Sequence, residues 1–305
     1  MTDFSGYYAA LLTPFSPDGS AIRDDVLARL VRRNVDAGLT GLYVGGSTGE
    51  AFLMCVEERI RLMAVASEAA GRACVLIAHI GDLNPAVSLQ LAKQAQNLGY
   101  DAVSAVPPFY YGYSFAELKA HYAELAQATA LPFVIYNFPA LTGVRLSSVQ
   151  LAELLELPGI VGIKNTCGDH YALEQLRRLS PDRVILNGFD ETLLAGMSLG
   201  TDGGIGSTYN VQADKVLKLA ASFAEGDVEE ARRIQAAMNG FIDVITHHGV
   251  LPSLKFVLGL QGLEMGDCRP PFLPLSSGAK ASLEQAVDKY LDLQDISVAR
   301  STDGE

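Results

Sequence analysis

Short apolar runs rich in β-branched residues alternate with amphipathic stretches along most of this chain. The runs have the length of buried strands and end at Gly, Pro or polar residues. They cover residues 7–14, 41–46, 74–80, 102–108, 132–139, 160–166, 183–188 and 203–207. Between them, apolar residues recur at helical spacing, for example in residues 24–37, 56–70, 85–98, 115–129 and 171–179. This alternation predicts an α/β fold with parallel strands.

Eight strands, each followed by a helix, are the count of a (β/α)8 TIM barrel. A doubly wound sheet is the alternative, but no GxGxxG motif follows the first strand and no acidic residue is placed for a ribose. After residue 226 the strands stop, and residues 227–295 indicate about three helices. We therefore expect a barrel over residues 1–226 and a C-terminal helical extension, residues 227–305, packed on it.

Composition narrows the class of protein further. The chain has 305 residues and a formal charge of −12, which argues against a nucleic-acid-binding surface. Its four cysteines are scattered, so we expect neither a disulfide framework nor a zinc site. We also expect no signal peptide and no membrane helix, because the first apolar run lacks a basic leader and no apolar span reaches 18 residues. The sequence thus indicates a cytoplasmic globular protein.

Polar residues gather where the predicted strands end, which is where TIM-barrel active sites form. Among them, Lys164 is the only lysine in a predicted barrel strand. A solvated lysine amine is almost fully protonated at neutral pH, but burial without a carboxylate partner disfavours the ammonium. Such an amine suits imine formation with a carbonyl substrate. The alternative for Lys164 is an ion pair with an acidic residue inside the barrel. Lys255 also has apolar neighbours, but we expect its side chain to extend to solvent.

Two further strand ends suggest partners for Lys164. The turn "GGSTGE" offers backbone N–H groups and the hydroxyls of Ser47 and Thr48, which suit one carboxylate, although a plain tight turn is the alternative. It lacks the GK[ST] ending of a triphosphate site. Tyr136, at the end of the fifth strand, lies next to Lys164 in barrel order and could relay protons. The alternative is a core tyrosine.

The stretch "NGFDE" carries the acidic pair Asp190 and Glu191 at a helix start. Helix capping accounts for one acid. The second suits the hydroxyl groups of a polyol, because carboxylates accept several hydrogen bonds. No metal-ligand cluster accompanies the pair, so we predict no metal, and we expect His79 to be structural or on the surface.

Five motifs in order, "GGSTGE", "YNFPALTGV", "GIKNT", "NGFDE" and "GGIGSTYN", resemble the pyruvate-dependent lysine aldolases of the N-acetylneuraminate lyase and dihydrodipicolinate synthase superfamily. The resemblance implies a Schiff-base aldolase on a TIM barrel that assembles as a homotetramer and needs no cofactor. The synthase branch typically carries an arginine after the tyrosine motif, where this chain has Ala140 and Leu141. The acidic pair and "GSTYN" look like the sialic-acid lyase branch, which implies cleavage of N-acetylneuraminate to N-acetylmannosamine and pyruvate.

The resemblance implies a role for each residue of this chain that matches a family motif. Lys164 would form the imine, Tyr136 would transfer protons, and Ser47 and Thr48 would hold the pyruvate carboxylate. The residues that would receive the amide and hydroxyl groups of the sugar are Thr166, Gly188, Asp190, Glu191 and Ser207. Tyr110 and Tyr111 either reach a neighbouring subunit or pack at the rim.

Two other functions remain open at this point. One is a related aldolase or synthase acting on another 2-keto-3-deoxy acid. The other is a catalytically silent carbohydrate-binding barrel, against which the Lys164 and Tyr136 pair argues.

Overall fold

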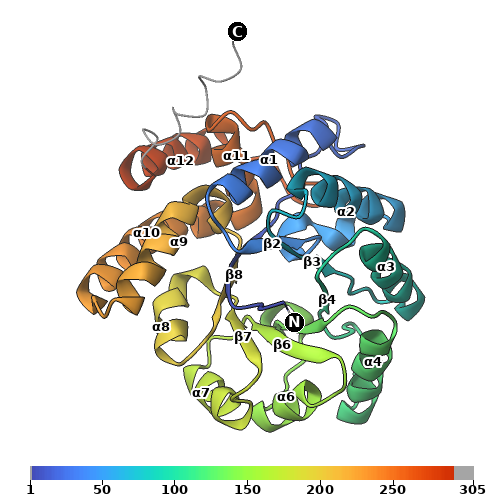
Figure 1. Cartoon of the computed structure of the whole chain (residues 1–305). Helices are drawn as coiled ribbons and strands as arrows, with labels where there is room; N and C mark the ends of the chain where they lie inside the picture. Colours follow the sequence, from blue (N-terminus) through green and yellow to red (C-terminus); the bar gives the residue numbers. More distant parts are fainter. Residues whose placement is uncertain (1, 292–305) are drawn as a thin grey trace.

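The computed structural model of the chain describes residues 2–291. Its centre is a closed barrel of parallel strands in which each strand pairs with the next and β8 pairs with β1 (Figure 1). The strands are β1 (Gly6–Ala10), β2 (Gly41–Val44), β3 (Val75–His79), β4 (Ala102–Ala105), β5 (Phe133–Asn137), β6 (Ile160–Asn165), β7 (Val184–Asn187) and β8 (Gly203–Gly206). The predicted (β/α)8 barrel is confirmed, and the doubly wound sheet is excluded because that sheet is open.

Helices surround the barrel, and the amphipathic stretches noted in the sequence form many of them (Figure 1). They are α1 (Asp24–Asp36), α2 (Val56–Ala70), α3 (Pro85–Asn97), α4 (Phe115–Gln127), α5 (Pro139–Thr142), α6 (Ser148–Leu155), α7 (His170–Leu179), α8 (Leu193–Ser198) and α9 (Tyr209–Ala224). Single 3₁₀ turns lie in the loops after β2 and β7: η1 (Ser47–Gly49), η2 (Ala51–Leu53) and η3 (Asp190–Thr192).

The strands end earlier than their apolar runs suggested. β1 ends at Ala10 and β4 at Ala105, whereas the runs continue to residues 14 and 108. The additional residues are buried but leave the sheet, and the prolines at the ends of these runs have no N–H to donate to a neighbouring strand. Several polar residues at the strand ends therefore lie in loops above the barrel.

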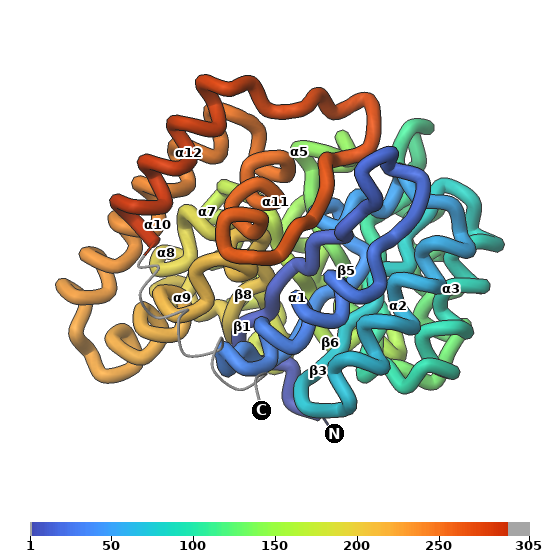
Figure 2. The backbone as a smooth tube through the Cα atoms, turned by 90° about the horizontal axis from the view of Figure 1, so that it is seen from above, coloured from blue at the N-terminus to red at the C-terminus, as the bar shows by residue number. Residues whose placement is uncertain are grey.

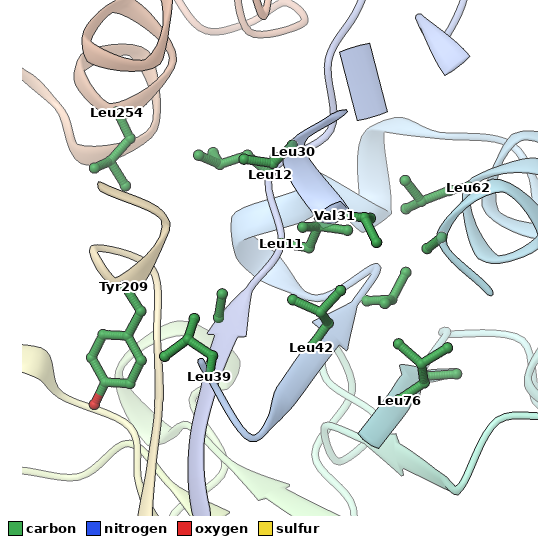
Figure 3. Close-up of a cluster of buried hydrophobic side chains, with 14 of the residues drawn as sticks. Leu11, Leu12, Leu30, Val31, Leu39, Leu42, Leu62, Leu76, Tyr209 and Leu254 are labelled. Atoms are coloured by element: carbon green, nitrogen blue, oxygen red, sulfur yellow. The ribbon is translucent and has the colours of Figure 1, made fainter. Parts of the chain in front are cut away.

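The apolar core has two layers. Tyr8, Leu186 and other inward-facing side chains fill the barrel itself. A larger layer lies between strands and helices, where Leu42 of β2 packs among residues such as Leu30 of α1 and Leu62 of α2 (Figure 3). Because both faces of these strands are buried, their sequences read as continuous apolar runs rather than alternating ones.

In the described part of the chain, three helices follow the barrel: α10 (Val228–His248), α11 (Val250–Leu260) and α12 (Ser277–Tyr290). They confirm the predicted C-terminal helices, and α10 packs against α9, α11 and α12. Residues 261–276, between α11 and α12, run along the same end of the barrel as the loop after β1 (Figure 2). Residues 292–305, part of the predicted extension, lie outside the described residues. None of the helices described is long and apolar enough to cross a membrane.

Candidate active site

Lys164 lies inside the barrel near the C-terminal end of β6, and it is only 4% exposed. Strand register places it beside Tyr136 of β5, on the same face. Its Nζ lies 4.2 Å from the centre of the Tyr136 ring and 4.6 Å from that of Tyr43. Across residues 2–291, no carboxylate oxygen lies within the 4.0 Å of Nζ that would make an ion pair. The ion-pair alternative for this lysine is therefore wrong, and its amine is sheltered by two aromatic faces.

Tyr43 of β2 is a second aromatic neighbour of the amine, and the sequence reasoning did not single it out. Its ring meets Tyr136 edge to face with centres 5.8 Å apart. Its hydroxyl lies 3.0 Å from Ser104 Oγ, and burial raises the pKa of Tyr43 well above its usual value. Tyr43 therefore stays a neutral phenol. The sequence could have indicated Tyr43 as a site residue, because it lies in a buried strand just before "GGSTGE".

The Gly-rich turn after β2 forms η1, with Ser47 and Thr48 half-buried. Their N–H groups head the turn and so have no acceptor within it. Two anchors from the barrel fix its ends: Thr13 Oγ1 donates to the Gly49 carbonyl at 2.7 Å, and His79 Nδ1 lies 3.0 Å from the Gly45 carbonyl. The turn therefore presents, from a fixed backbone, two N–H donors that have no acceptor among residues 2–291.

His79 at the end of β3 is buried, as a structural histidine would be. Burial and the neighbouring Arg59 charge lower the pKa of His79 well below its usual value. The neutral ring then carries its proton on Nδ1 and donates it to the Gly45 carbonyl. The ring also lies edge-on to Tyr136, with centres 6.0 Å apart. Its place beside the site was not foreseen, because nothing in its sequence spacing marks it.

Thr166 and Gly188 follow β6 and β7 and lie against each other. Thr166 is buried, and its Oγ1 has no hydrogen-bond partner among the described residues. A Cβ added to Gly188 would lie 1.9 Å from that oxygen. Glycine at position 188 therefore makes room for the Thr166 hydroxyl.

Alanine at position 188 is expected to force Thr166 out of place, because the added Cβ cannot coexist with Oγ1. We expect Gly188→Ala to lower the free energy of unfolding by about 1–3 kcal/mol, measured by urea denaturation. Gly168→Ala is the matched control, since a Cβ there meets no atom within 4 Å. Equal losses in the two variants would show that Gly188 has no steric role.

Asp190 begins η3 and is buried, with Oδ2 accepting hydrogen bonds from the Thr208 N–H at 2.8 Å and from the Thr208 hydroxyl at 2.6 Å. Burial raises the pKa of Asp190 to about 6, although these hydrogen bonds partly offset it. Glu191 is exposed, and Ser207 at the end of β8 is half-buried. The two acids that the sequence paired thus have different environments.

The raised pKa of Asp190 has a measurable consequence for stability. Its folded value of about 6 exceeds the ordinary 3.8, so the native state binds the proton more tightly than the unfolded chain does. Stability from this group is therefore present at low pH and lost as pH rises through about 4 to 6, by about 3 kcal/mol in all. The melting temperature of Asp190→Asn minus that of the unsubstituted protein should therefore increase as the pH rises from about 4 to 6. A difference that stays constant between pH 4 and pH 7 would contradict this.

Lys255 does not reach solvent, contrary to the expectation from its sequence. Its side chain is 1% exposed, and Nζ lies 2.6 Å from Glu50 Oε1. The two residues are far apart in the chain, and no local pattern indicates their contact. Lys255 therefore differs from Lys164, because its charge is paired with a carboxylate.

A largely apolar pocket of about 350 Å³ opens beside the Gly-rich turn. Its lining includes Ser47, Phe138 and Leu141 from the barrel loops, and Leu251 and Phe272 from the C-terminal part of the chain. The barrel and the C-terminal helices thus share one cavity at this end. Within residues 2–291, no group of three or more His, Cys, Asp or Glu side chains could hold a metal ion.

Known proteins resemble this chain over nearly its whole length. An N-acetylneuraminate lyase of Rhizobium meliloti is 44% identical over 286 residues, which are 94% of this chain and 95% of the relative. The solved structure of CdNal from Clostridium difficile, in complex with mannosamine, has a TM-score of 0.92 and 38% identity, covering 95% and 100% of the two chains. That of N-acetylneuraminate lyase from Fusobacterium nucleatum, complexed with pyruvate, has a TM-score of 0.90 and 38% identity, covering 94% and 97%.

A family model gives the broader assignment. The model of the dihydrodipicolinate synthetase family matches residues 3–290. That span includes all of β1 to β8 and the helices through α12. The chain therefore belongs to the dihydrodipicolinate synthetase family.

Proposed function

We propose that this protein is a class I aldolase that cleaves N-acetylneuraminate to N-acetylmannosamine and pyruvate, reversibly. The observation that carries the proposal is Lys164, a buried amine held against Tyr136 at the C-terminal end of the barrel, with no carboxylate partner among residues 2–291. An amine in such a setting is suited to capture a ketone. The similarity to N-acetylneuraminate lyases across nearly the full length of both chains supports this substrate.

The proposed reaction begins with the open-chain keto acid, whose carboxylate binds at Ser47 and Thr48. Lys164 Nζ adds to the C2 carbonyl carbon, and the carbinolamine loses water to give a protonated imine. The base is the substrate carboxylate, or Tyr136 after it has given its own proton to the leaving carbinolamine hydroxyl. It takes the C4 hydroxyl proton, the C3–C4 bond breaks, and the electron pair of that bond moves into the imine. N-acetylmannosamine leaves as the aldehyde. The resulting enamine is protonated at C3 and hydrolysed, which releases pyruvate and restores the amine.

We assign the sugar end of the substrate to the loops after β6, β7 and β8. There the Thr166 hydroxyl, which has no partner within residues 2–291, and the exposed Glu191 carboxylate are available for hydrogen bonds to the polyol. Asp190 offers Oδ1, since Oδ2 already accepts two hydrogen bonds from Thr208. Gly188 and Ser207 border the same loops.

We also propose a cytoplasmic homotetramer that uses neither a metal nor an organic cofactor, because the imine itself accepts the electron pair. The loop after β4 supports the assembly, since Tyr110 and Tyr111 are 82% and 68% exposed and their rings pack edge to face. Such paired exposed aromatic side chains are typical of interfaces. All four cysteines are free thiols, as expected in a reducing compartment. Light scattering after gel filtration tests the tetramer.

A substrate panel tests the activity itself. Pyruvate release from N-acetylneuraminate is compared with release from shorter 2-keto-3-deoxy acids, and pyruvate consumption is measured with aspartate semialdehyde. We expect kcat/KM to be highest for N-acetylneuraminate, since Leu141 replaces the arginine that would hold a second carboxylate. Preference for a shorter keto acid, or consumption with the semialdehyde, would replace this proposal with another aldolase or a synthase.

A further inference from the structure

A buried ion pair joins the Gly-rich turn after β2 to the C-terminal helices. Glu50, which follows η1, places Oε1 2.6 Å from Nζ of Lys255 in α11, with both side chains essentially inaccessible to solvent. Lys255 Nζ also lies 3.2 Å from the Asp267 carbonyl and 4.4 Å from the centre of the Phe15 ring. Glu50 Oε2 accepts the backbone N–H of Arg269 at 2.8 Å. One carboxylate oxygen of Glu50 therefore contacts α11 and the other contacts the segment after it.

Stability alone is a poor explanation for this pair. Two buried charges lose most of their hydration, and their attraction often recovers no more than an apolar pair of the same size would contribute. Buried ion pairs instead fix one geometry when their hydrogen-bond partners are placed on both sides. Glu50 is held on two sides, by the ion pair with Lys255 at Oε1 and by the hydrogen bond from the Arg269 N–H at Oε2.

The backbone at Glu50 connects this pair directly to the proposed carboxylate-binding residues. Glu50 has φ 58° and ψ 37°, a left-handed conformation that costs free energy for a residue other than glycine. Its N–H donates to the Ser47 carbonyl at 3.1 Å, and it directly follows Ser47, Thr48 and Gly49. Any shift of Glu50 therefore moves the Ser47 and Thr48 donors.

We propose that Glu50 and Lys255 are positioning residues for the carboxylate of pyruvate, so that the C-terminal helices complete the active site of the barrel. The inference rests on the proposed function. Thr13 and His79 hold the Gly49 and Gly45 carbonyls at the two ends of the turn. The ion pair with Lys255 fixes the side chain of Glu50, the residue that directly follows the turn. The Ser47 and Thr48 donors bind a carboxylate well only when supporting residues hold them in place, so a loosened turn should bind the carboxylate poorly.

The double variant Glu50→Gln/Lys255→Met tests this without leaving a buried charge unpaired. Glutamine keeps an acceptor for the Arg269 N–H, and methionine fills most of the lysine volume. Condensation of pyruvate with N-acetylmannosamine should show a pyruvate KM raised about 10-fold or more with kcat changed less than about 3-fold, because carboxylate binding is shared by ground and transition states. The pyruvate concentration for half-maximal borohydride trapping at Lys164 should rise by the same factor.

Another ion pair, Arg177–Asp202, supplies the control. It lies at the opposite end of the barrel, where Asp202 also accepts the Ile185 N–H. Arg177→Met/Asp202→Asn is expected to lower the melting temperature and leave the pyruvate KM unchanged. If the Glu50/Lys255 double variant does not fold, Lys255→Arg, which keeps the charge but changes its reach, carries the same KM test.

The outcomes separate this inference from the proposed function. Wild-type protein that forms the Lys164 adduct, together with a folded double variant of unchanged pyruvate dependence, would overturn the positioning role alone. Wild-type protein that forms no adduct at any pyruvate concentration would overturn the proposed function and the positioning role with it. A raised KM in the double variant, with an unchanged KM in the Arg177/Asp202 control, supports the inference.

Discussion

Replacing Lys164 by alanine is expected to lower kcat by at least about 10⁴-fold, the scale of losing a covalent nucleophile. No other amine in the described structure lies against the Tyr136 ring. The fold should persist, because within residues 2–291 the Lys164 side chain makes no ion pair and no hydrogen bond whose loss would leave a buried group unpaired. Circular dichroism and the melting temperature check the fold, and a coupled assay of pyruvate release checks the rate. Residual activity within 10-fold of wild type would refute imine catalysis at this residue.

Trapping the imine tests the role of Lys164 directly, because it leaves a stable adduct that can be located. Borohydride with pyruvate should add one three-carbon group, located by peptide mass spectrometry at Lys164. Lys255 is an internal control, since it is equally buried but paired with Glu50. Because its Nζ is held 2.6 Å from Glu50 Oε1, it should remain unmodified. Modification of Lys255 in place of Lys164 would move the chemistry from β6 to α11.

Phenylalanine in place of Tyr136 is expected to lower kcat about 10²- to 10⁴-fold, the contribution of one general acid–base group. The ring that shelters Lys164 remains, so affinity for pyruvate and adduct formation at equilibrium should change little. Stopped-flow measurement of single turnovers separates imine formation from C–C cleavage and locates the slowed step.

Tyr43→Phe is the matched control for this variant. It removes a hydroxyl from a second ring that also faces the Lys164 amine, but that hydroxyl is already bonded to Ser104. We expect a loss of less than about 10-fold in kcat, since a structural hydrogen bond contributes only about 1 kcal/mol. If Tyr43→Phe lowers kcat as much as Tyr136→Phe does, the proton-transfer role belongs to the other phenol or to both.

Much of the fold could be predicted because its signals are local. Apolar runs separated by helical periodicity give the order of strands and helices, and the closed parallel barrel follows from their count. The position of Lys164 inside the barrel also follows, since few other residues in its strand are polar. Strand ends were less predictable, because buried residues such as Leu11 continue the apolar pattern after the chain has left the sheet.

The contacts between distant segments could not be predicted. Lys255 has apolar neighbours whether it extends to water or meets a carboxylate, and only the folded chain brings Glu50 to it. His79 illustrates the same limit, since its partner is a backbone carbonyl, which no residue pattern marks. Thr166 and Gly188 were named together through the family resemblance, but their steric dependence on each other requires the coordinates.

The tie between Glu50 and Lys255 also has a consequence for the order of events during protein synthesis. All eight strands leave the ribosome before α11 does. At that stage Glu50 lacks the contact with Lys255, and the apolar layer around the barrel lacks Leu254 (Figure 3). We expect the loop after β2 to be loosely ordered until translation is nearly finished, because the contacts of Glu50 with Lys255 and Arg269 form only then. Ribosome-stalled chains ending before α11 should accordingly be cut by protease at the loop after β2, and longer chains should resist.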